Sequence, residues 1–184
     1  AIDIVVNGKE ENFDYVIFAT HADTTKKLIS DISKEEKNAL DKFSYTNNKT
    51  VLHKDRGLVP SNYRLLAAWN YTQKNDPTNG TSQTSFTYCM NILQHIPHDT
   101  PVFVTLNPKI DIDKNMIYAI EEYSHPQYNL ESLDGQKAIS KLQGKRNTFY
   151  TGAYLGYGFH EDGVVSAIQV AKKLNISPPW QNQK

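Results

Sequence analysis

Cysteine is nearly absent from this chain, which has Cys89 alone among its 184 residues. One cysteine forms no disulfide within the chain, so the sequence excludes a disulfide-stapled secreted module and favours a reducing compartment. Long apolar runs are also missing, because no segment has the roughly 20 apolar residues that cross a bilayer. The N-terminal residues lack the basic and apolar blocks of a signal peptide. We therefore expect a cytoplasmic protein without a membrane span.

An excess of charge of either sign is lacking too. Lysine and arginine number 20, as do aspartate and glutamate, and the formal net charge is +0. This balance gives no electrostatic footprint for nucleic acid or for an anionic membrane surface. The apolar fraction of 39% is that of a folded globular protein. Nucleic acid is therefore not an expected partner.

The residue patterns of metal sites and hydrolytic triads are missing as well. His160, Glu161 and Asp162 are consecutive and point in different directions, whereas a helical zinc pair needs ligands three or four positions apart. The other histidines show no such spacing, and there is no Gly-x-Ser-x-Gly elbow, since Ser166 falls inside an expected helix. Cys89 lies in an alternating pattern that favours a buried small hydrophobe over a nucleophile. We expect no metal.

The N-terminal segment contains two β-branched apolar runs, residues 2–8 and 14–20. The polar residues 9–12 separate them, which predicts a hairpin of two strands. The second run is apolar throughout, so it is expected to be buried on both faces. Ser33 and Glu36 then form a capping-box pattern for one of two short helices that follow.

Period-two patterning predicts a central sheet between residues 45 and 123. One alternating set is Tyr63, Leu65, Ala67, Trp69 and Tyr71, and the next is Phe86, Tyr88, Met90 and Ile92. They predict an antiparallel pair joined by the turn-rich residues 72–83. Further strands are expected at 50–55, 101–107 and 116–123. A mixed or antiparallel sheet of about five strands follows.

The last third of the chain is expected to run helix, strand, glycine loop, helix. Residues 130–144 are helical in composition, although Gly135 weakens the pattern, and residues 147–153 form a strand. The final helix is expected over 162–174, ended by Asn175 and Pro178. Its predicted apolar face consists of Val164, Ala167, Ile168, Ala171 and Leu174.

The glycine loop between that strand and helix has two interpretations. Gly152, Gly156, Gly158 and Gly163 would let backbone approach a flat or charged ligand, and the helix N-terminus suits a phosphate or an electron-rich carbonyl. Alternatively, the glycines only form a tight turn and Asp162 is an ordinary N-cap. The loop is not a full phosphate-binding fingerprint, so the residues themselves leave both open.

A series of short segments resembles one family in order along the chain. They are "FDYVIFATHAD", "TVLHKD", "AAWNY", "TYCMNILQ", "VFVTLNP", "EYSHPQY" and "TFYTGAYLGYGFHEDGVVSAIQVAKKL". Together, from about residue 13 to 174, they resemble the flavin-containing amine oxidase superfamily, in particular its bacterial branch of NAD/FAD-binding, amine oxidase-like oxidoreductases. The last segment is similar to the family's C-terminal FAD-contacting stretch.

The resemblance implies an α+β chain in two domains. Residues 1–22 and 147–184 would belong to a Rossmann-like FAD-binding domain, and residues 23–146 to a substrate domain built on a mostly antiparallel sheet with helices. FAD is the implied cofactor, and the helix N-terminus would face the pyrimidine end of its ring system. Matched residue by residue, the implied cofactor contacts are Gly152, Ala153, Gly158, Phe159, His160, Glu161, Asp162 and Gly163.

The chain departs from the family pattern in three places. The first is the end of the second N-terminal strand, which usually reads Ala-x-Pro in relatives and here reads Ala19, Thr20, His21. An acidic residue commonly follows the first glycine of the segment in relatives, where this chain has Ala153. The Gly-x-Gly-x-x-Gly loop that cradles the pyrophosphate is missing, and a chain without it should not hold FAD tightly by itself. We therefore expect the C-terminal fragment of a longer oxidoreductase, inactive alone, whose partners are a small-molecule substrate and the remainder of its own FAD domain.

The implied reaction is hydride transfer from an organic substrate to flavin, which performs the difficult step itself. Trp69, Tyr88 and Tyr157 are candidates for the substrate pocket, although aromatic stripes on sheets more often belong to a core. His160 could assist proton transfer or make a structural hydrogen bond, and no catalytic residue is assigned. Asn70 could be a pocket group or an exposed side chain, as could Asn91. Alternative functions are a flavin-dependent desaturase or isomerase of a lipid or polyene, and a non-catalytic binding domain.

Overall fold

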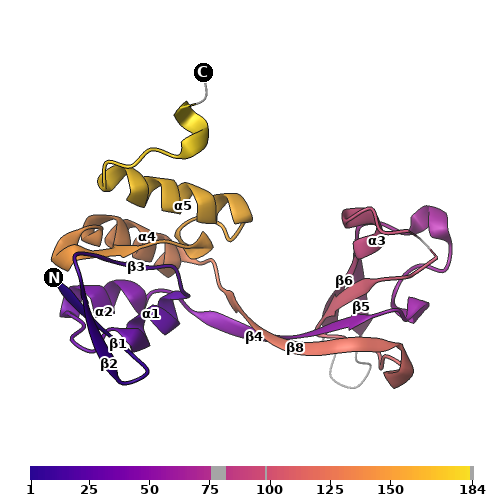
Figure 1. Ribbon diagram of the computed structural model, residues 1–184. Coiled ribbons are helices and arrows are strands. Elements are labelled where there is room, and N and C mark those ends of the chain that lie inside the picture. The colour runs from indigo at the N-terminus through magenta and orange to yellow at the C-terminus, as the bar shows by residue number, and fades with distance from the viewer. Residues whose placement is uncertain (76–81, 98, 183–184) are drawn as a thin grey trace. The chain divides into compact units, whose positions relative to one another are not determined.

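The computed structural model describes residues 1–75, 82–97 and 99–182 of the chain. It is an α+β structure that divides into two compact units (Figure 1). Residues Ala1–Thr46 and Pro126–Lys184 form what we call the helical unit, and Asn47–His125 form the sheet unit. The expected domain boundaries lie elsewhere, after residues 22 and 146. The assignment of segments to an FAD-binding or a substrate domain stays a prediction.

Helices and strands are mixed along the chain. The α-helices are α1 (Ala22–Leu28), α2 (Lys34–Leu40), α3 (Met90–Leu93), α4 (Leu130–Leu142) and α5 (His160–Lys173). The strands are β1 (Ile2–Val6), β2 (Lys9–Phe13), β3 (Val16–Phe18), β4 (Tyr45–His53), β5 (Trp69–Asn75), β6 (Ser82–Cys89), β7 (Phe103–Leu106), β8 (Ile117–Pro126) and β9 (Thr148–Tyr150). Short 3-10 turns are Arg56–Leu58, Tyr63–Leu65, Lys114–Met116, Lys145–Asn147, Ala153–Leu155 and Pro179–Asn182.

The N-terminal hairpin pairs β1 with β2, so the expected pairing of residues 2–8 with 14–20 is wrong. Asn7 and Gly8 have φ angles of 51° and 77°, the positive values that a tight two-residue hairpin turn requires. The polar run after that turn is therefore itself a strand. Strand β3 instead pairs in parallel with β9. Ile17 of β3 is 48% exposed, so the expectation of burial on both faces is also wrong.

The core of the helical unit lies between its helices and β9. Ala39, Leu40, Ile139 and Tyr150 are buried together in it. The predicted capping box is confirmed, because the Ser33 side chain accepts a hydrogen bond from the Glu36 N–H and the Glu36 carboxylate accepts one from the Ser33 N–H. Packing explains the glycine at position 135 of α4, because a Cβ there would lie 2.9 Å from the Phe43 ring. The glycine allows α4 to approach that ring closely.

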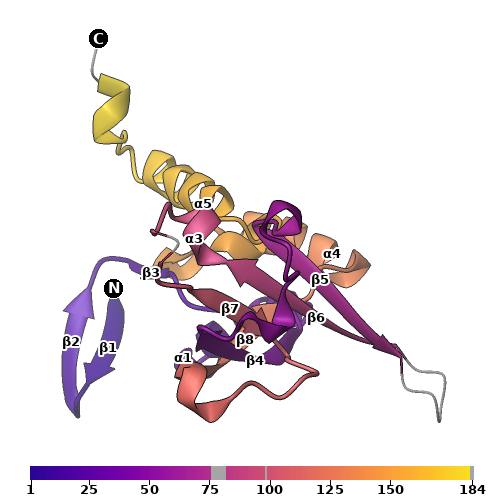
Figure 2. The same cartoon turned by 90° about the vertical axis from the view of Figure 1, so that its right-hand side faces the viewer.

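The sheet unit contains the expected five-stranded sheet, in the order β5-β6-β7-β4-β8 (Figure 2). The β5–β6, β6–β7 and β7–β4 pairs are antiparallel, which confirms the predicted pair before and after residues 76–81. The alternating patterns are longer than the strands. Tyr63 and Leu65 lie in a 3-10 turn, and Met90 and Ile92 lie in α3, because the chain bends out of the sheet at both ends of this pair.

One face of this sheet is buried and largely polar. Thr87 and Thr105 are directly paired and are both at most 1% exposed. The Thr105 hydroxyl oxygen lies 2.8 Å from that of Thr87 and 2.8 Å from Nε2 of His53, which is fully buried. Cys89, on the same face, is buried as predicted. Asn70 and Asn91 are also buried, so neither is an ordinary exposed side chain.

The opposite face of the sheet is apolar and more open. Trp69 pairs with Tyr88, and Tyr88 pairs with Val104 of the next strand. Trp69 is 64% exposed and Tyr71 is 56% exposed, although both side chains are aromatic. The Trp69 ring packs edge-on against the Tyr88 ring at a centroid distance of 5.3 Å. The aromatic side chains of β5 thus lie on the exposed face of the sheet, whereas Val51, Cys89 and Phe103 are buried on the other face.

We expect the sheet unit to lose stability as the pH falls below about 6.5. Burial lowers the pKa of His53 in the folded chain, more than the nearby Asp55 charge raises it. Below the unfolded-state pKa the unfolded chain binds a proton that the folded chain does not, so the free energy of unfolding decreases by up to about 1.4 kcal/mol per pH unit. Urea unfolding at pH 5.5–7.5, followed by Trp69 fluorescence in a Trp180→Phe background, measures this slope.

The control for that experiment separates His53 from the other histidines. His53→Gln is expected to remove most of the pH slope, because glutamine does not titrate. His95→Asn, at an exposed position that has a positive φ and thus tolerates asparagine, is expected to leave the slope unchanged. An equally steep slope in His53→Gln would assign the pH dependence to other groups.

Candidate functional site

The glycine loop follows β9 at the edge where the parallel strands β3 and β9 both end. The Thr151 N–H donates to the Phe18 carbonyl at 2.9 Å, which extends the pairing by one residue. Beyond it come Gly152, a 3-10 turn at Ala153–Leu155, and the start of α5. Ligands of parallel sheets bind beyond the carboxyl ends of the strands, so this loop has the location of a ligand site.

Helix α5 begins at His160, two positions before its expected start at 162. Asp162 is therefore the third residue of the helix and not its N-cap. Its Oδ2 accepts hydrogen bonds from the backbone N–H groups of Tyr157, at 3.0 Å, and Phe159, at 2.9 Å. The carboxylate thus fixes the last turn of the loop against the helix start.

Three of the four loop glycines are required by contacts within the chain. A Cβ at Gly152 would lie 2.8 Å from the Tyr154 ring, and one at Gly156 would lie 2.4 Å from Oδ1 of Asp162. Gly158 has a φ of 90°, and a Cβ there would lie 2.3 Å from the Tyr128 hydroxyl oxygen. The tight-turn interpretation accounts for these three positions.

Gly163 is different, because no contact in the described chain requires it to be glycine. The nearest atom to an added Cβ would be the Ala153 nitrogen, at 3.8 Å, which is an ordinary van der Waals distance. Glycine inside a helix costs about 1 kcal/mol relative to alanine. A ligand that approaches the backbone beside Gly163 would account for that cost.

Ser166 holds the loop and the helix together, a role that the sequence analysis did not predict. Its hydroxyl donates to the Gly163 carbonyl at 2.7 Å and accepts from the Gly152 N–H at 2.9 Å. The Thr151 hydroxyl oxygen lies 2.7 Å away. Ser166 is buried, and the Gly152 N–H is consequently not available to a ligand. The only signal for this role in the sequence is a hydroxyl residue three positions after Gly163.

The backbone N–H groups of Ala153, His160 and Glu161 have no acceptor among the residues that the structure describes. The first turn of a helix of fourteen residues presents two of them, together with the positive end of the helix dipole. Tyr157 is 69% exposed and Phe159 is 66% exposed beside this turn. The loop therefore offers unpaired donors, an apolar border and room at Gly163, and this arrangement fits an electron-rich planar group.

The structure brings the predicted cofactor contacts Gly152, Ala153 and Gly158–Gly163 into one loop and helix start, within the helical unit. Their contact with FAD stays a prediction. The predicted pocket residues are divided, because Tyr157 belongs to the helical unit whereas Trp69 and Tyr88 belong to the sheet unit. His160 is exposed, and its side chain makes no hydrogen bond within the described ranges.

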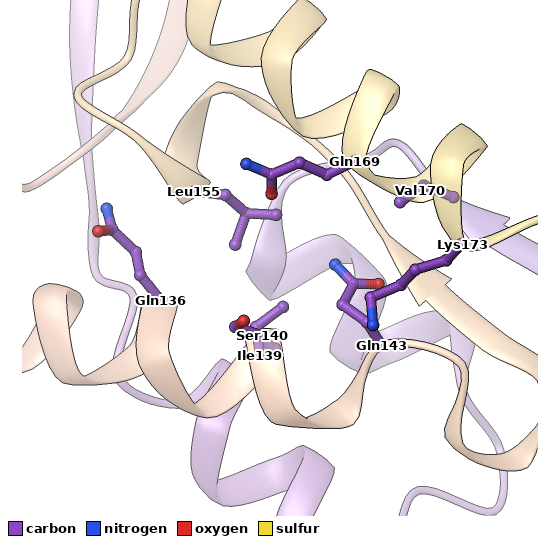
Figure 3. Close-up of a pocket in the computed structure, with 8 residues that line it drawn as sticks. All are labelled: Gln136, Ile139, Ser140, Gln143, Leu155, Gln169, Val170 and Lys173. Atoms are coloured by element: carbon purple, nitrogen blue, oxygen red, sulfur yellow. The ribbon is translucent and has the colours of Figure 1, made fainter. Parts of the chain in front are cut away.

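A small hollow of about 110 Å³ lies between α4 and α5 (Figure 3). The Gln136 side chain at its border donates to the Tyr154 carbonyl at 3.1 Å and to the Gly156 carbonyl at 2.7 Å. Gln143 uses both ends of its amide on the backbone of Tyr150. The Gln136 and Gln143 side chains thus fix the backbone of the loop and of β9 on the side that faces α4. The hollow is too small for a dinucleotide, because ligand pockets measure about 300–1,000 Å³.

The described residues hold no group of three or more His, Cys, Asp or Glu side chains that could bind a metal ion. In the same part of the chain, no helix has the length and apolar character needed to cross a membrane.

Comparison with known proteins gives a structural similarity and no sequence match. No family model matches the chain, and no curated protein matches it. Among solved structures, the chain is similar to the CLA-producing fatty acid isomerase from P. acnes, with a TM-score of 0.58 and 12% sequence identity. The similarity covers 95% of this chain and 44% of that protein, so this chain spans less than half of its length. At this identity the similarity shows the fold alone.

Proposed function

We propose that this chain is part of an FAD-dependent enzyme that transfers hydride from an organic substrate to flavin. The observation that carries the proposal is the open position at Gly163, which faces the unpaired Ala153 N–H next to the start of α5. When bound, the flavin supplies a two-electron acceptor for the hydride. The similarity to a larger solved enzyme over 95% of this chain supports the coarse fold on which this proposal depends.

Residues of this chain would bind and orient the cofactor. The N–H groups of His160 and Glu161 would donate to an electron-rich part of the ring system, where the helix dipole stabilises negative charge. Asp162 and Ser166 would act indirectly, by fixing the loop through the backbone hydrogen bonds that they make. The exposed ring of Phe159 would border the site and limit the access of water.

A second candidate function is isomerisation of an unsaturated lipid. One specific observation favours it: the solved protein with a similar fold is described as a fatty acid isomerase. The open aromatic face of the sheet unit, with Trp69 and Tyr71, is also suited to an apolar substrate. Both candidates require flavin, and they differ in whether the substrate is oxidised overall.

Absorbance of the purified protein tests the common part of the two functions. The chain expressed together with its upstream coding sequence is expected to show a flavin absorbance band, whereas the isolated 184-residue chain is expected to be colourless. A colourless longer protein, or an upstream sequence without a Gly-x-Gly-x-x-Gly strand-turn-helix, would refute both candidates. Oxygen consumption with polyamines, compared with isomer analysis of fatty acids, then separates oxidase from isomerase.

Filling the position at Gly163 is expected to remove flavin without unfolding the chain. Gly163→Val adds bulk between the helix and the Ala153 N–H, so flavin retention should fall by at least about tenfold. The valine Cβ fits, because it lies 3.8 Å from the Ala153 nitrogen, and the better helix propensity of valine offsets crowding by its two γ-methyl groups, so we expect the chain to stay folded. Flavin absorbance per protein and thermal unfolding measure the two effects.

Ala167→Val is the matched control, since it places the same branched side chain at an exposed position of the same helix. It should leave the flavin content unchanged. Equal flavin content in Gly163→Val and Ala167→Val would show that no ligand approaches Gly163.

A further inference from the structure

The five-stranded sheet has two edge strands, β5 and β8, which differ in their protection against pairing with another chain. Glu121 and Glu122 place two negative charges in β8, and Pro126 ends it. Charged residues and prolines of this kind keep an edge from pairing with a further strand. Residues 69–72 of β5 include no charge and no proline, and β5 pairs with β6 one-to-one from Trp69 to Asn75. The β5 edge is therefore open to a further strand.

The backbone groups of Trp69 and Tyr71 point to this open edge. The Cys89 N–H of β6 donates to the Ala68 carbonyl at 2.9 Å. Hydrogen-bonded pairs alternate with non-bonded pairs along an antiparallel ladder, so every second residue from Ala68 bonds to β6. Trp69 and Tyr71 therefore direct their N–H and C=O groups away from β6, where these groups have no partner among the residues that the structure describes. The edge thus presents two donors and two acceptors in a row.

An open hollow of about 470 Å³ lies along the same edge. Four consecutive residues of β5, 69–72, line it together with residues 57–60. Successive residues of a strand point to opposite faces, so a hollow that touches all four lies beside the strand and not over one face of the sheet. Its volume is within the range of ligand sites, which measure about 300–1,000 Å³. There is therefore room for a ligand beside the unpaired backbone groups of β5.

The buried polar side chain of the hollow is already engaged within the chain. The Asn70 amide donates to the carbonyls of Ala67 at 2.7 Å and Thr87 at 3.2 Å, and its Oδ1 accepts from the Ala67 N–H at 3.2 Å. None of the described residues that line the hollow is charged, and Pro60 and Trp69 add apolar surface. A row of backbone donors and acceptors with an uncharged, partly apolar border matches an extended peptide, the ligand of β-strand addition.

We propose that the hollow along β5 binds an extended, uncharged peptide segment of another polypeptide, which adds a strand to the edge of the sheet. The backbone of the segment pairs with Trp69 and Tyr71. A single segment fits between β5 and residues 57–60, whereas a second copy of this chain would bring its own residues 57–60 to the same place. The inference goes beyond the proposed function and requires no flavin, because every group that it uses belongs to the sheet unit.

Amide hydrogen exchange, followed by NMR on the isotope-labelled chain, tests the pairing residue by residue. The probe is acetyl-Thr-Val-Thr-Val-Thr-Val-amide, which is uncharged and favours an extended conformation. At saturating peptide, exchange of the Trp69 and Tyr71 N–H groups should slow at least about tenfold, because they gain a partner. The N–H groups of Asn70 and Thr72 face β6, so their exchange should not change. Unchanged exchange at Trp69 and Tyr71, or no binding at millimolar peptide, would overturn the proposal.

Two N-methylated forms of the same peptide separate strand pairing from contact with its side chains. An extended peptide directs alternate N–H groups to opposite edges, so methyl groups on the valine nitrogens block one edge and methyl groups on the threonine nitrogens block the other. One form should bind at least about tenfold more weakly than the other. Equal affinities of the two forms would show that backbone pairing does not hold the peptide.

Substitution at Tyr71 tests the same contact from the side of the protein. Tyr71→Pro removes one outward N–H, and proline is tolerated on the outer side of an edge strand. This variant should bind the peptide at least about tenfold more weakly than Tyr71→Thr, which loses the same ring but keeps the N–H. Circular dichroism verifies that both variants are folded, and the N-methylated peptides test the wild-type chain if the proline variant is not. Equal binding by two folded variants would refute the contact at Tyr71.

The other outcomes are also distinguishable. Light scattering at increasing protein concentration detects a second copy on the same edge. A dimer that forms without peptide and slows exchange at Trp69 and Tyr71 would assign the edge to self-association and overturn the proposal. Peptide binding by a longer protein that never contains flavin would support this inference and refute the proposed function, whereas flavin without peptide binding would do the reverse.

Discussion

Replacing Arg146 by alanine is expected to destabilise the helical unit by about 1.5–3 kcal/mol, because its partner Glu36 is buried although the guanidinium itself is 44% exposed. The Arg146 guanidinium donates to Oε2 of Glu36 at 2.7 Å, and the Glu36 carboxylate is 4% exposed. Burial alone would raise the pKa of Glu36, but hydrogen bonds from Ser33 and Tyr150 and the Arg146 charge lower it below its ordinary value. The carboxylate is therefore ionised at neutral pH, and the variant leaves it buried without its cation.

Hydrogen exchange measured on peptides is suited to this prediction, because it reports on each unit separately. Protection should fall for peptides of α2 and β9, which the Glu36–Tyr150 hydrogen bond of 3.0 Å connects, and should be unchanged for residues 47–125. Asp31→Asn is the matched control. Asp31 pairs with the same guanidinium but is 76% exposed, so its loss should cost at most about 1 kcal/mol. Equal losses of stability in Arg146→Ala and Asp31→Asn would show that the burial of Glu36 does not determine the effect of Arg146.

Features determined by neighbouring residues could be predicted from the sequence. The Ser33 and Glu36 capping box forms as expected, since its groups are only three positions apart. The strand-loop-helix order around Gly152 is also as expected. The N-terminal hairpin was predicted incorrectly, although Asn7-Gly8 is a strong turn signal, because the polar residues after the turn did not resemble a strand. The prediction followed the two apolar runs and gave the Asn7-Gly8 turn signal too little weight.

Features that depend on distant contacts could not be predicted in the same way. A side chain at Gly158 would clash with the Tyr128 hydroxyl, thirty positions earlier. The Gly152 N–H donates to the hydroxyl of Ser166 in the following helix. No local pattern contains these pairs. Contacts in the folded chain account for Gly152, Gly156 and Gly158 by packing, whereas no contact with a described residue requires Gly163 to be glycine.

Which face of a helix or strand is buried also could not be predicted from the pattern of apolar residues. Periodicity predicted an apolar face on α5 with Val164 and Ala167, but both are exposed, and the buried residues of this helix are Ser166 and Val170. In the sheet unit, Thr87 and Thr105 are buried beside Phe103, whereas Trp69 on the opposite face is 64% exposed. A pattern identifies the apolar face, but it does not determine whether that face contacts this chain. Such exposed apolar faces are typical of surfaces that bind a ligand or another protein segment.

Gly156→Ala is expected to disrupt the loop itself, which makes it the strongest single test of the site. A Cβ at Gly156 would lie 2.4 Å from Oδ1 and 2.7 Å from Cβ of Asp162, so rotation of the carboxylate alone does not relieve the clash. Asp162 must then move away from the N–H groups of Tyr157 and Phe159. We expect a loss of about 1–3 kcal/mol in stability from overpacking. Flavin retention in the longer protein should fall at least about tenfold.

Gly163→Ala is the matched variant for that experiment, because it adds the same methyl group seven positions later in the same loop and helix. Its Cβ meets no atom closer than 3.8 Å, so it should be neutral or stabilising by up to about 1 kcal/mol. Thermal unfolding and flavin absorbance of both variants then separate the two roles of glycine in this loop. Gly156→Ala should lose both stability and flavin, whereas Gly163→Ala should lose flavin alone. Wild-type stability in Gly156→Ala would show that Asp162 does not fix the loop, because the loop would then accept its displacement without cost.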